Sequence, residues 1–194
     1  MDKNKELSPE KSFELINEII SEARSKFEEN GFIYMFWGAL IAFATIGQFI
    51  LIRQGHAAIS WYPYLLMPAG AVFTAFYYAR KEKSRVNRIS KALGMLWWAI
   101  AFNLMILGFF YASLLREHLI PVFLILQGIG MIGAGAIIEN RWLLLAGLVT
   151  NIAAFICFHL NWQFHPLLAG IVAIVAIFVP GMMIMLKHKK STHV

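Results

Sequence analysis

The sequence is poor in charged residues and has almost no aspartate. Only 14% of its 194 residues are charged and 59% are apolar, whereas a soluble domain usually has about 25% charged and about 45–50% apolar residues. Its single aspartate, Asp2, lies near the start of the chain, which argues against enzymes that bind metals through aspartates within a membrane. Catalytic motifs such as G-x-S-x-G and H-E-x-x-H are absent as well. The composition predicts a polytopic membrane protein that is not an enzyme and needs no cofactor.

The sequence also lacks a second cysteine and a secretory signal. Cys157 stands alone in an apolar run, so a disulfide within the chain is excluded. The first residues, MDKNKELSPEKS, are polar where a signal peptide would have a basic start and an apolar core. We therefore expect the first apolar run itself to direct insertion.

Apolar runs long enough to cross a membrane are abundant. A helix needs about 20 apolar residues to span a hydrocarbon core of about 30 Å, and helices satisfy their own backbone hydrogen bonds in lipid. Six runs qualify, at 32–52, 62–79, 93–115, 120–138, 142–160 and 167–186. The predicted fold is all-α, with a cytoplasmic helix in 1–31, a six-helix bundle over 32–186 and a basic tail at 187–194.

The positions of Lys and Arg predict the orientation of these spans. All of them except Arg53 and Arg116 fall on one side, and positively charged loops are retained in the cytoplasm. We expect a protein of the bacterial cytoplasmic membrane with both termini in the cytoplasm. Its net charge of +6 then reflects topology, so direct nucleic-acid binding is not expected. Membrane lipids are expected partners, and the sequence is compatible with a homo-oligomer.

Each even-numbered run opens with a proline, at Pro63, Pro121 and Pro166. Proline is favoured in the first turn of a helix, where its missing N–H would have no partner. The pattern predicts three in-out-in hairpins. Descent from one repeated unit and independent use of a good helix start both explain it.

Two further patterns concern packing within the spans. The stretch GIGMIGAGA, from Gly128 to Ala136, gives the fourth run a small-residue face for close helix packing. Pro180 and Gly181 lie well inside the sixth run and predict a bend or local break, because proline removes a backbone hydrogen bond and clashes with the preceding turn. A moving hinge and a static kink are both open.

Polar residues within the runs are few. Asn103, Gln127 and Asn151 fall near the middle of the third, fourth and fifth runs. They are candidates for a polar site in a small-molecule or ion carrier or channel, or they bond across helices for about 0.6–2 kcal/mol each. Asp, Glu, Lys and Arg are missing at this depth, which argues against coupled transport.

Four histidines map near the outer face: His56, His118, His159 and His165. Imidazole binds zinc and copper and titrates near neutral pH, so a metal site or a pH sensor is conceivable there. Helical i, i+4 spacing is absent and carboxylate support is limited to Glu117. We therefore interpret them as interface histidines and predict no metal site.

The segment before the first span has the pattern of an amphipathic helix. Ser8 and Pro9 form a helix start, and Asn30 with Gly31 forms a stop. Its apolar stripe consists of Phe13, Ile16, Ile20, Ala23 and Phe27, widened by Leu15 and Ile19. This stripe predicts a packing surface.

The charge of this helix limits what it packs against. Six acidic and three basic residues lie between Ser8 and Gly31, whereas helices that lie on anionic lipid are rich in Lys and Arg. The basic loop that separates the second and third runs has the opposite charge, through Arg80, Lys81, Lys83, Arg85, Arg88 and Lys91. An intramolecular lid over this loop and a surface for a cytoplasmic protein are the two leading interpretations.

The block ELSPEKSFELINEIISEARSKFEENGFIYMFWG, from Glu6 to Gly38, together with Val179, Pro180 and Gly181, resembles an uncharacterised family of small six-span bacterial membrane proteins. The resemblance implies that the N-terminal helix is a feature of the family, and it implies no activity. Genes of that family often neighbour one for a winged-helix transcriptional regulator, so such a regulator is a candidate partner. The leading hypothesis is a membrane sensor, scaffold or tether for a cytoplasmic partner.

Overall fold

The computed structural model describes residues 9–29, 31–80 and 88–191, which are helical nearly throughout and contain no strand. The α-helices are α1 (Pro9–Glu29), α2 (Gly31–Arg53), α3 (Leu66–Arg80), α4 (Arg88–Phe110), α5 (Ala112–Leu115), α6 (Leu119–Ile137), α7 (Arg141–Cys157), α8 (His165–Val172) and α9 (Val179–Ser191). Short 3₁₀ turns are η1 (Ala57–Ile59), η2 (Tyr62–Leu65), η3 (Arg116–His118) and η4 (Trp162–Phe164), and η5 (Ala173–Phe178) is a π-helix. The prediction of an all-α chain is confirmed for these residues.

Four helical stretches of the described residues are long and apolar enough to cross a membrane. They are Gly31–Arg53, Lys91–Phe110, Ala112–Ile137 and Trp162–Leu186, and α7 is apolar but shorter. These stretches support a membrane protein. The complete set of six spans stays a prediction.

The second and fifth predicted spans are shorter α-helices than expected. The second was predicted from residue 62, but Tyr62–Leu65 forms a 3₁₀ turn with Pro63 near its start, so α3 begins only at Leu66. The fifth was predicted to residue 160, but α7 ends at Cys157 before a turn. The third predicted run, 93–115, also divides at Tyr111 into α4 and α5.

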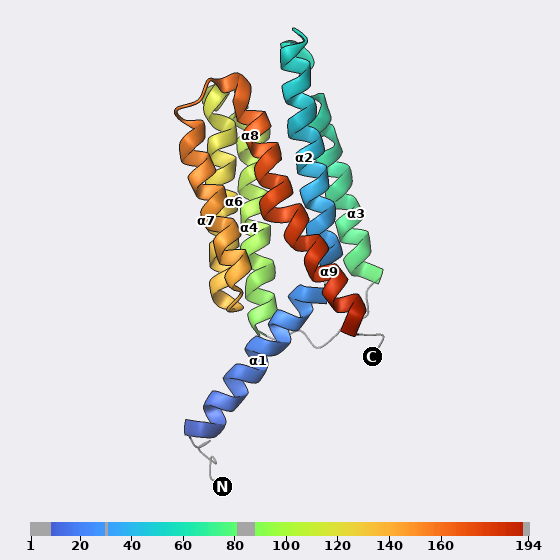
Figure 1. Cartoon of the computed structure of the whole chain (residues 1–194), viewed down its shortest axis with the longest axis vertical. Coiled ribbons are helices and arrows are strands. Elements are labelled where there is room, and N and C mark those ends of the chain that lie inside the picture. The colour runs from blue at the N-terminus through green and yellow to red at the C-terminus, as the bar shows by residue number, and fades with distance from the viewer. Residues whose placement is uncertain (1–8, 30, 81–87, 192–194) are drawn as a thin grey trace.

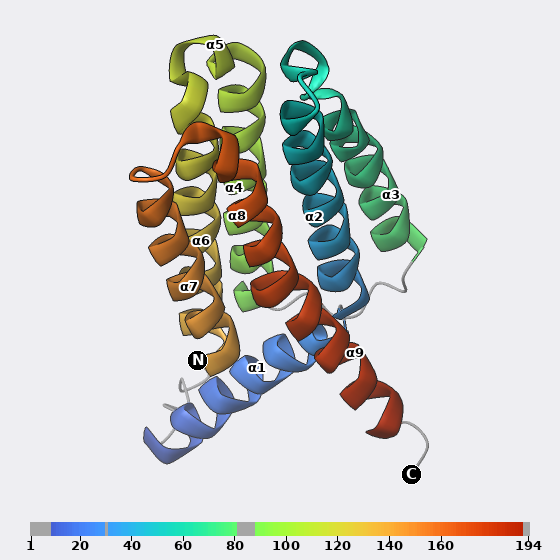
Figure 2. The same ribbon diagram turned by 45° about the horizontal axis from the view of Figure 1, so that its top comes forward.

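The helices form an elongated bundle, and α1 extends from one end of it (Figures 1 and 2). α2 packs mainly along α8, η5 and α9, whereas α6 packs mainly on α7 and also on α4. α3 lies at the edge beside α2. Helices next to each other in the sequence are therefore not always the closest partners in space.

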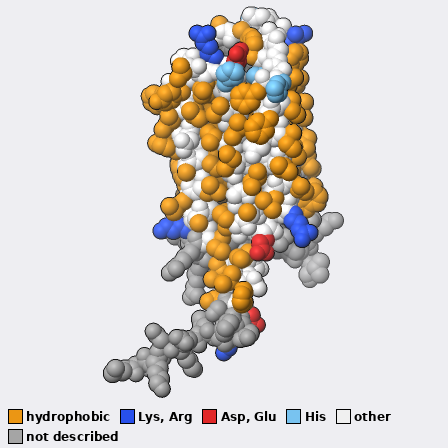
Figure 3. Space-filling model, turned by 90° about the vertical axis from the view of Figure 1, so that its left-hand side faces the viewer, with side chains coloured by type: hydrophobic (Ala, Val, Ile, Leu, Met, Phe, Trp, Pro, Cys, Tyr) orange, Lys and Arg blue, Asp and Glu red, His pale blue; other side chains and the backbone are white. Residues whose placement is uncertain are grey.

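Charged side chains lie toward the two ends of the bundle, and the face shown in Figure 3 is apolar between them. We call the end next to α1 the proximal end and the opposite end the distal end. The proximal end contains Arg80 and Glu139, and the distal end contains Arg53, Arg116 and Glu117. This banded distribution is typical of a chain that crosses a membrane.

Glycines allow two close helix contacts. A Cβ at Gly38 of α2 would lie 2.5 Å from the backbone nitrogen of Phe178, and one at Gly181 of α9 would collide with the backbone nitrogen of Met35. In the second contact, a Cβ at Gly128 of α6 would lie 2.9 Å from the carbonyl oxygen of Gly147 of α7. The predicted small-residue packing face of the fourth run is therefore confirmed.

The last helix continues through Pro180 without a break. Directly before it, η5 is π-helical, and the N–H of Val179 bonds to the carbonyl oxygen of Ile174, five residues back. A π-helical turn widens the backbone and so accommodates a residue that would clash with the turn of an α-helix. The predicted irregularity is present as a π-helix rather than a break, and movement about Pro180 and Gly181 stays a prediction.

Candidate functional site

The first half of α1 presents exposed apolar side chains. Phe13 is 68% exposed, Leu15 is 47% exposed and Ile16 is 50% exposed. Ile19 and Ile20, one turn further on, are half-buried. The predicted stripe is therefore uncovered at its N-terminal end and partly covered toward the bundle.

The arrangement of α1 bears on the two interpretations of this helix. α1 contacts α9, α4 and α2, and its N-terminal half runs away from the bundle (Figures 1 and 2). A lid would bury the start of the stripe, but Phe13 and Ile16 remain exposed. Among the described side chains, this end of the stripe is therefore left uncovered. The side chain of Phe27 lies outside the described part of the helix.

The charges around α1 are on exposed positions. Glu14, Glu18 and Glu22 are exposed on α1, and Arg80 is exposed at the end of α3. Lys81 and Arg85 of the predicted basic surface lie outside the described residues. Arg88 begins α4, but its side chain is not described.

The three amides predicted near the membrane centre are not assembled into one site. Asn103 is exposed on α4, and its Nδ2 donates to the carbonyl oxygen of Ala99 one turn earlier, at 2.8 Å. Asn151 faces α6 at Gly128, and its buried Oδ1 has no hydrogen-bond partner among the described residues. Gln127, beside Gly128, is half-buried. Of the predicted trio, Asn103 thus belongs to the outer surface of the bundle.

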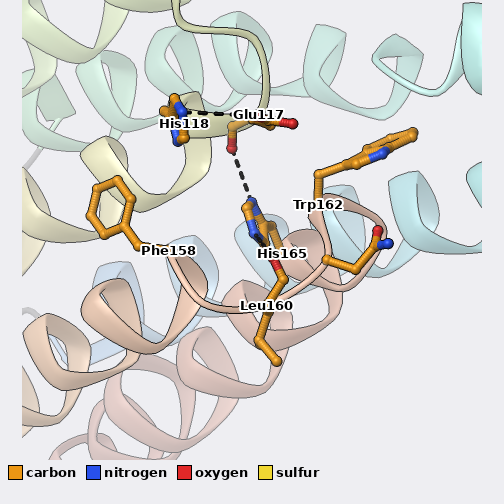
Figure 4. Close-up of a pocket in the computed structure, with 7 residues that line it drawn as sticks. Glu117, His118, Phe158, Leu160, Trp162 and His165 are labelled. Carbon is orange, nitrogen blue, oxygen red and sulfur yellow. Dashed lines mark hydrogen bonds and ion pairs between the residues drawn. The ribbon is translucent and has the colours of Figure 1, made fainter.

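A buried histidine joins two loops at the distal end. His165 is 3% exposed at the start of α8. Its Nδ1 lies 2.9 Å from the carbonyl oxygen of Glu117, and its Nε2 lies 3.1 Å from the carbonyl oxygen of Leu160 (Figure 4). The ring therefore links the η3 turn to the turn between α7 and η4. We call these three residues the His165 bridge.

The His165 bridge decides what this histidine can bind. A neutral imidazole has one N–H, whereas the imidazolium form donates from both nitrogens. The tautomer of a neutral His165 thus decides which of the two carbonyl oxygens receives a hydrogen bond. Because each ring nitrogen faces a carbonyl oxygen, His165 has no nitrogen free to ligate a metal.

The other distal histidines also form no metal site. His118 Nε2 lies 3.8 Å from Glu117 Oε1, and both side chains are more than half exposed. His56 and His159 are exposed. Among the described residues, no group of three or more His, Cys, Asp or Glu side chains is placed to hold a metal ion.

Two cavities flank the His165 bridge, and both are lined by Glu117, Trp162 and His165. The first, of about 270 Å³, also has His118, Phe158, Leu160 and Asn161 in its wall. The second, of about 340 Å³, is completed by Gln48, Ile52, Arg116, Leu119, Ile120 and Pro166. Beside them, Arg116 has a φ of 45°, which is uncommon for a residue other than glycine.

Sequence reasoning predicted the distal position of these histidines but missed the bridge. Its partners are backbone carbonyls, one of them 48 residues away in the chain, so side-chain spacing carries no signal for them. Comparisons with protein-family models, curated proteins and solved structures find no match for this chain. The exposed stripe of α1 and the distal cavities are thus the features from which function is inferred.

Proposed function

We propose that this chain is a non-enzymatic protein of the bacterial cytoplasmic membrane that holds or senses a cytoplasmic protein through α1. In this proposal six spans form three hairpins and both termini are cytoplasmic. The observation that carries it is the exposure of Phe13, Leu15 and Ile16 on a helix that extends from the bundle. Such a face binds a groove or a helix of a partner through its apolar stripe.

The energetics of the stripe support a protein partner. Full burial of a large apolar side chain contributes at most about 1.5–3 kcal/mol, so three half-exposed side chains supply several kcal/mol in a complex. Exposed ion pairs contribute less, typically under about 1 kcal/mol each, and mainly select the partner. The net acidic charge between Ser8 and Gly31 favours a partner with a basic rim around an apolar groove. A winged-helix transcriptional regulator is one candidate.

The acidic charge of α1 favours a protein surface over an anionic lipid surface as its partner. A helix that lies on an anionic leaflet gains about 1 kcal/mol for each basic residue near the surface. Between Ser8 and Gly31 the chain has twice as many acidic as basic residues. Lipid would repel this helix, whereas a basic protein surface would attract it.

A face-specific crosslinking experiment tests this proposal in cells of the native host. A photoreactive amino acid is placed at Ile16, within the stripe, or at Glu18, about 200° around the helix. We expect a discrete protein crosslink from position 16 and much less from position 18. Ile16→Glu in the full-length chain should abolish copurification of the crosslinked protein, and Glu18→Gln should not.

Two results would contradict the proposal. Equal crosslinking from positions 16 and 18 would show a helix without a binding face. Crosslinks from position 16 only to lipid would indicate that α1 is a surface anchor, and crosslinks only to the chain itself would indicate a lid.

A carrier or channel has less support. It would need polar groups converging near the membrane centre, but Asn103 is exposed and bonded to its own helix. The two cavities described above lie at the distal end. No observation favours this second function over a binding role for α1.

A further inference from the structure

The second distal cavity combines two opposite charges with an apolar wall. Arg116 and Glu117, adjacent in the chain, line it together with Ile52, Leu119 and Ile120. α8 lies between α2 and α6 in Figures 1 and 2, and it contributes the buried His165 and Pro166 to the lining. Charge thus lies at the end of the bundle, and apolar surface continues from it into the region between the helices.

Two of the polar residues that line this cavity have defined neighbours. The His165 bridge binds the backbone carbonyl of Glu117 and leaves its carboxylate outside the bridge, where Oε1 lies 3.8 Å from His118 Nε2 (Figure 4). Gln48 also lines the cavity, and its Oε1 accepts a hydrogen bond from the Tyr64 hydroxyl at 2.8 Å. The Gln48 amide nitrogen therefore remains a donor. The cavity is thus lined by a cationic group of Arg116, an anionic hydrogen-bond acceptor of Glu117 and an amide donor of Gln48.

From this arrangement we propose that the second distal cavity binds a zwitterionic phospholipid with a phosphate and a primary ammonium group in its head. The Arg116 guanidinium matches the phosphate, because its planar fork donates two parallel hydrogen bonds. The Glu117 carboxylate accepts from the ammonium group, which has three N–H donors. An acyl chain lies along Ile52, Leu119 and Ile120.

The depth of the cavity agrees with a lipid ligand. Trp162, which borders both cavities, is 42% exposed, and partly exposed tryptophans concentrate at the level of lipid headgroups. A fully polar soluble ligand would leave Ile52, Leu119 and Ile120 without an apolar partner. This inference concerns the distal end and does not depend on what α1 binds.

The pairing of Arg116 with Glu117 also sets the selectivity. A lone arginine would bind the phosphate of either kind of lipid, whereas the carboxylate beside it adds an anionic acceptor that pairs with an ammonium group. We therefore expect phosphatidylethanolamine to bind more tightly than phosphatidylglycerol, which has the phosphate without the ammonium. Loss of one charge-assisted hydrogen bond corresponds to about a tenfold loss of affinity.

Native mass spectrometry of the purified full-length chain in detergent, titrated with each of these two lipids, measures the preference. We expect about a tenfold preference for phosphatidylethanolamine in the original chain. Glu117→Gln should remove or reverse it, while the backbone carbonyl that His165 binds is retained. Glu139→Gln, which removes the exposed carboxylate at the proximal end, is the matched control and should leave the preference unchanged.

Arg116→Gln should lower the affinity for both lipids by a similar factor, and Arg141→Gln is its control. Soluble phosphoethanolamine should fail to displace the lipid at equal concentration, because it lacks the acyl chain. The proposal is overturned if the original chain binds phosphatidylglycerol as tightly, if Glu139→Gln acts like Glu117→Gln, or if phosphoethanolamine competes as well as the intact lipid.

Discussion

The helix pairs α6–α7 and α2–α3 both consist of neighbours in the sequence but differ in how they are held together. In the first pair, Gly128 and Gly147 bring two backbones into contact, and many residues of α6 and α7 pack on each other. In the second, α3 lies at the edge, with Trp37 Nε1 donating to Thr74 Oγ1 at 3.1 Å and with aromatic contacts between Phe36 and Phe73. Since lipid tails are as apolar as leucine, hydropathy alone provides no reason for helices to associate. Small residues and specific hydrogen bonds decide which pairs pack closely.

Gly147→Leu should break the tight pair and have the largest effect. A Cβ at Gly147 would lie 2.7 Å from the carbonyl oxygen of Gly128 and 2.8 Å from the nitrogen of Ile132, so α6 and α7 would have to separate. We expect a loss of at least about 3 kcal/mol in free energy of unfolding. Unfolding in mixed detergent measures it. Gly94→Leu on α4, where a Cβ would meet nothing within 4 Å, is the control; equal losses would contradict the role given to the glycine contact.

His165→Ala should release the turn after α7 from η3. At least one of the two backbone carbonyls loses its donor, and an unsatisfied buried polar group costs about 1–3 kcal/mol. We expect a loss of about 2–3 kcal/mol in free energy of unfolding and faster hydrogen exchange around Leu160 and Glu117. His159→Ala, at a neighbouring exposed position, should change stability by less than about 0.5 kcal/mol. A His165→Ala chain as stable as that control would show that the bridge does not hold the turns.

Asn140→Ala should weaken the start of α7. The Asn140 side chain is buried and accepts a hydrogen bond from the N–H of Leu143 at 3.1 Å, which caps the helix. Replacing such a cap by alanine costs about 1 kcal/mol. Thermal unfolding followed by circular dichroism should show the loss, and Asn140→Ser should restore most of it. Failure of serine to restore stability would mean that burial of Asn140, rather than capping, matters.

Trp37→Phe should have the smallest effect and should act on α3 alone. The change keeps the aromatic ring but removes the hydrogen bond to Thr74, and hydrogen bonds between membrane helices contribute about 0.6 kcal/mol on average. A double-mutant cycle with Thr74→Val isolates this coupling. A coupling energy above about 2 kcal/mol would contradict the view that α3 is loosely held.

The sequence predicted the features that depend on local chemistry. The helical class, four of the six apolar runs, the amphipathic pattern of α1 and the small-residue face of α6 follow from composition and spacing, and the structure agrees with them. The side-chain orientation of Asn103 was not predictable. A single amide in an apolar helix gives the same sequence pattern whether it faces lipid or a neighbouring helix. The short α-helix α3 was missed since Pro63 was assigned to an α-helical first turn, whereas it lies in a 3₁₀ turn.

The candidate site was less predictable than the fold. The four distal histidines were grouped by depth, but burial separates His165 from the exposed His56 and His159. The bridge depends on carbonyl oxygens, which every residue has, so only the three-dimensional path of the chain selects Glu117 and Leu160. For α1 the stripe was visible in the sequence, whereas its uncovered end depends on the angle at which the helix leaves the bundle.

The π-helix before Pro180 also determines how the residues of α9 are rotated about the helix axis. A π-helical turn contains about one residue more than an α-helical turn, so it rotates the rest of the helix by about 100° relative to an uninterrupted α-helix. On either side of the π-helix, Gly170 of α8 approaches α2 at Thr45, and Gly181 of α9 approaches it at Met35. The residues of α9 therefore meet α2 through side chains about 100° around the helix from those that an uninterrupted α-helix would present.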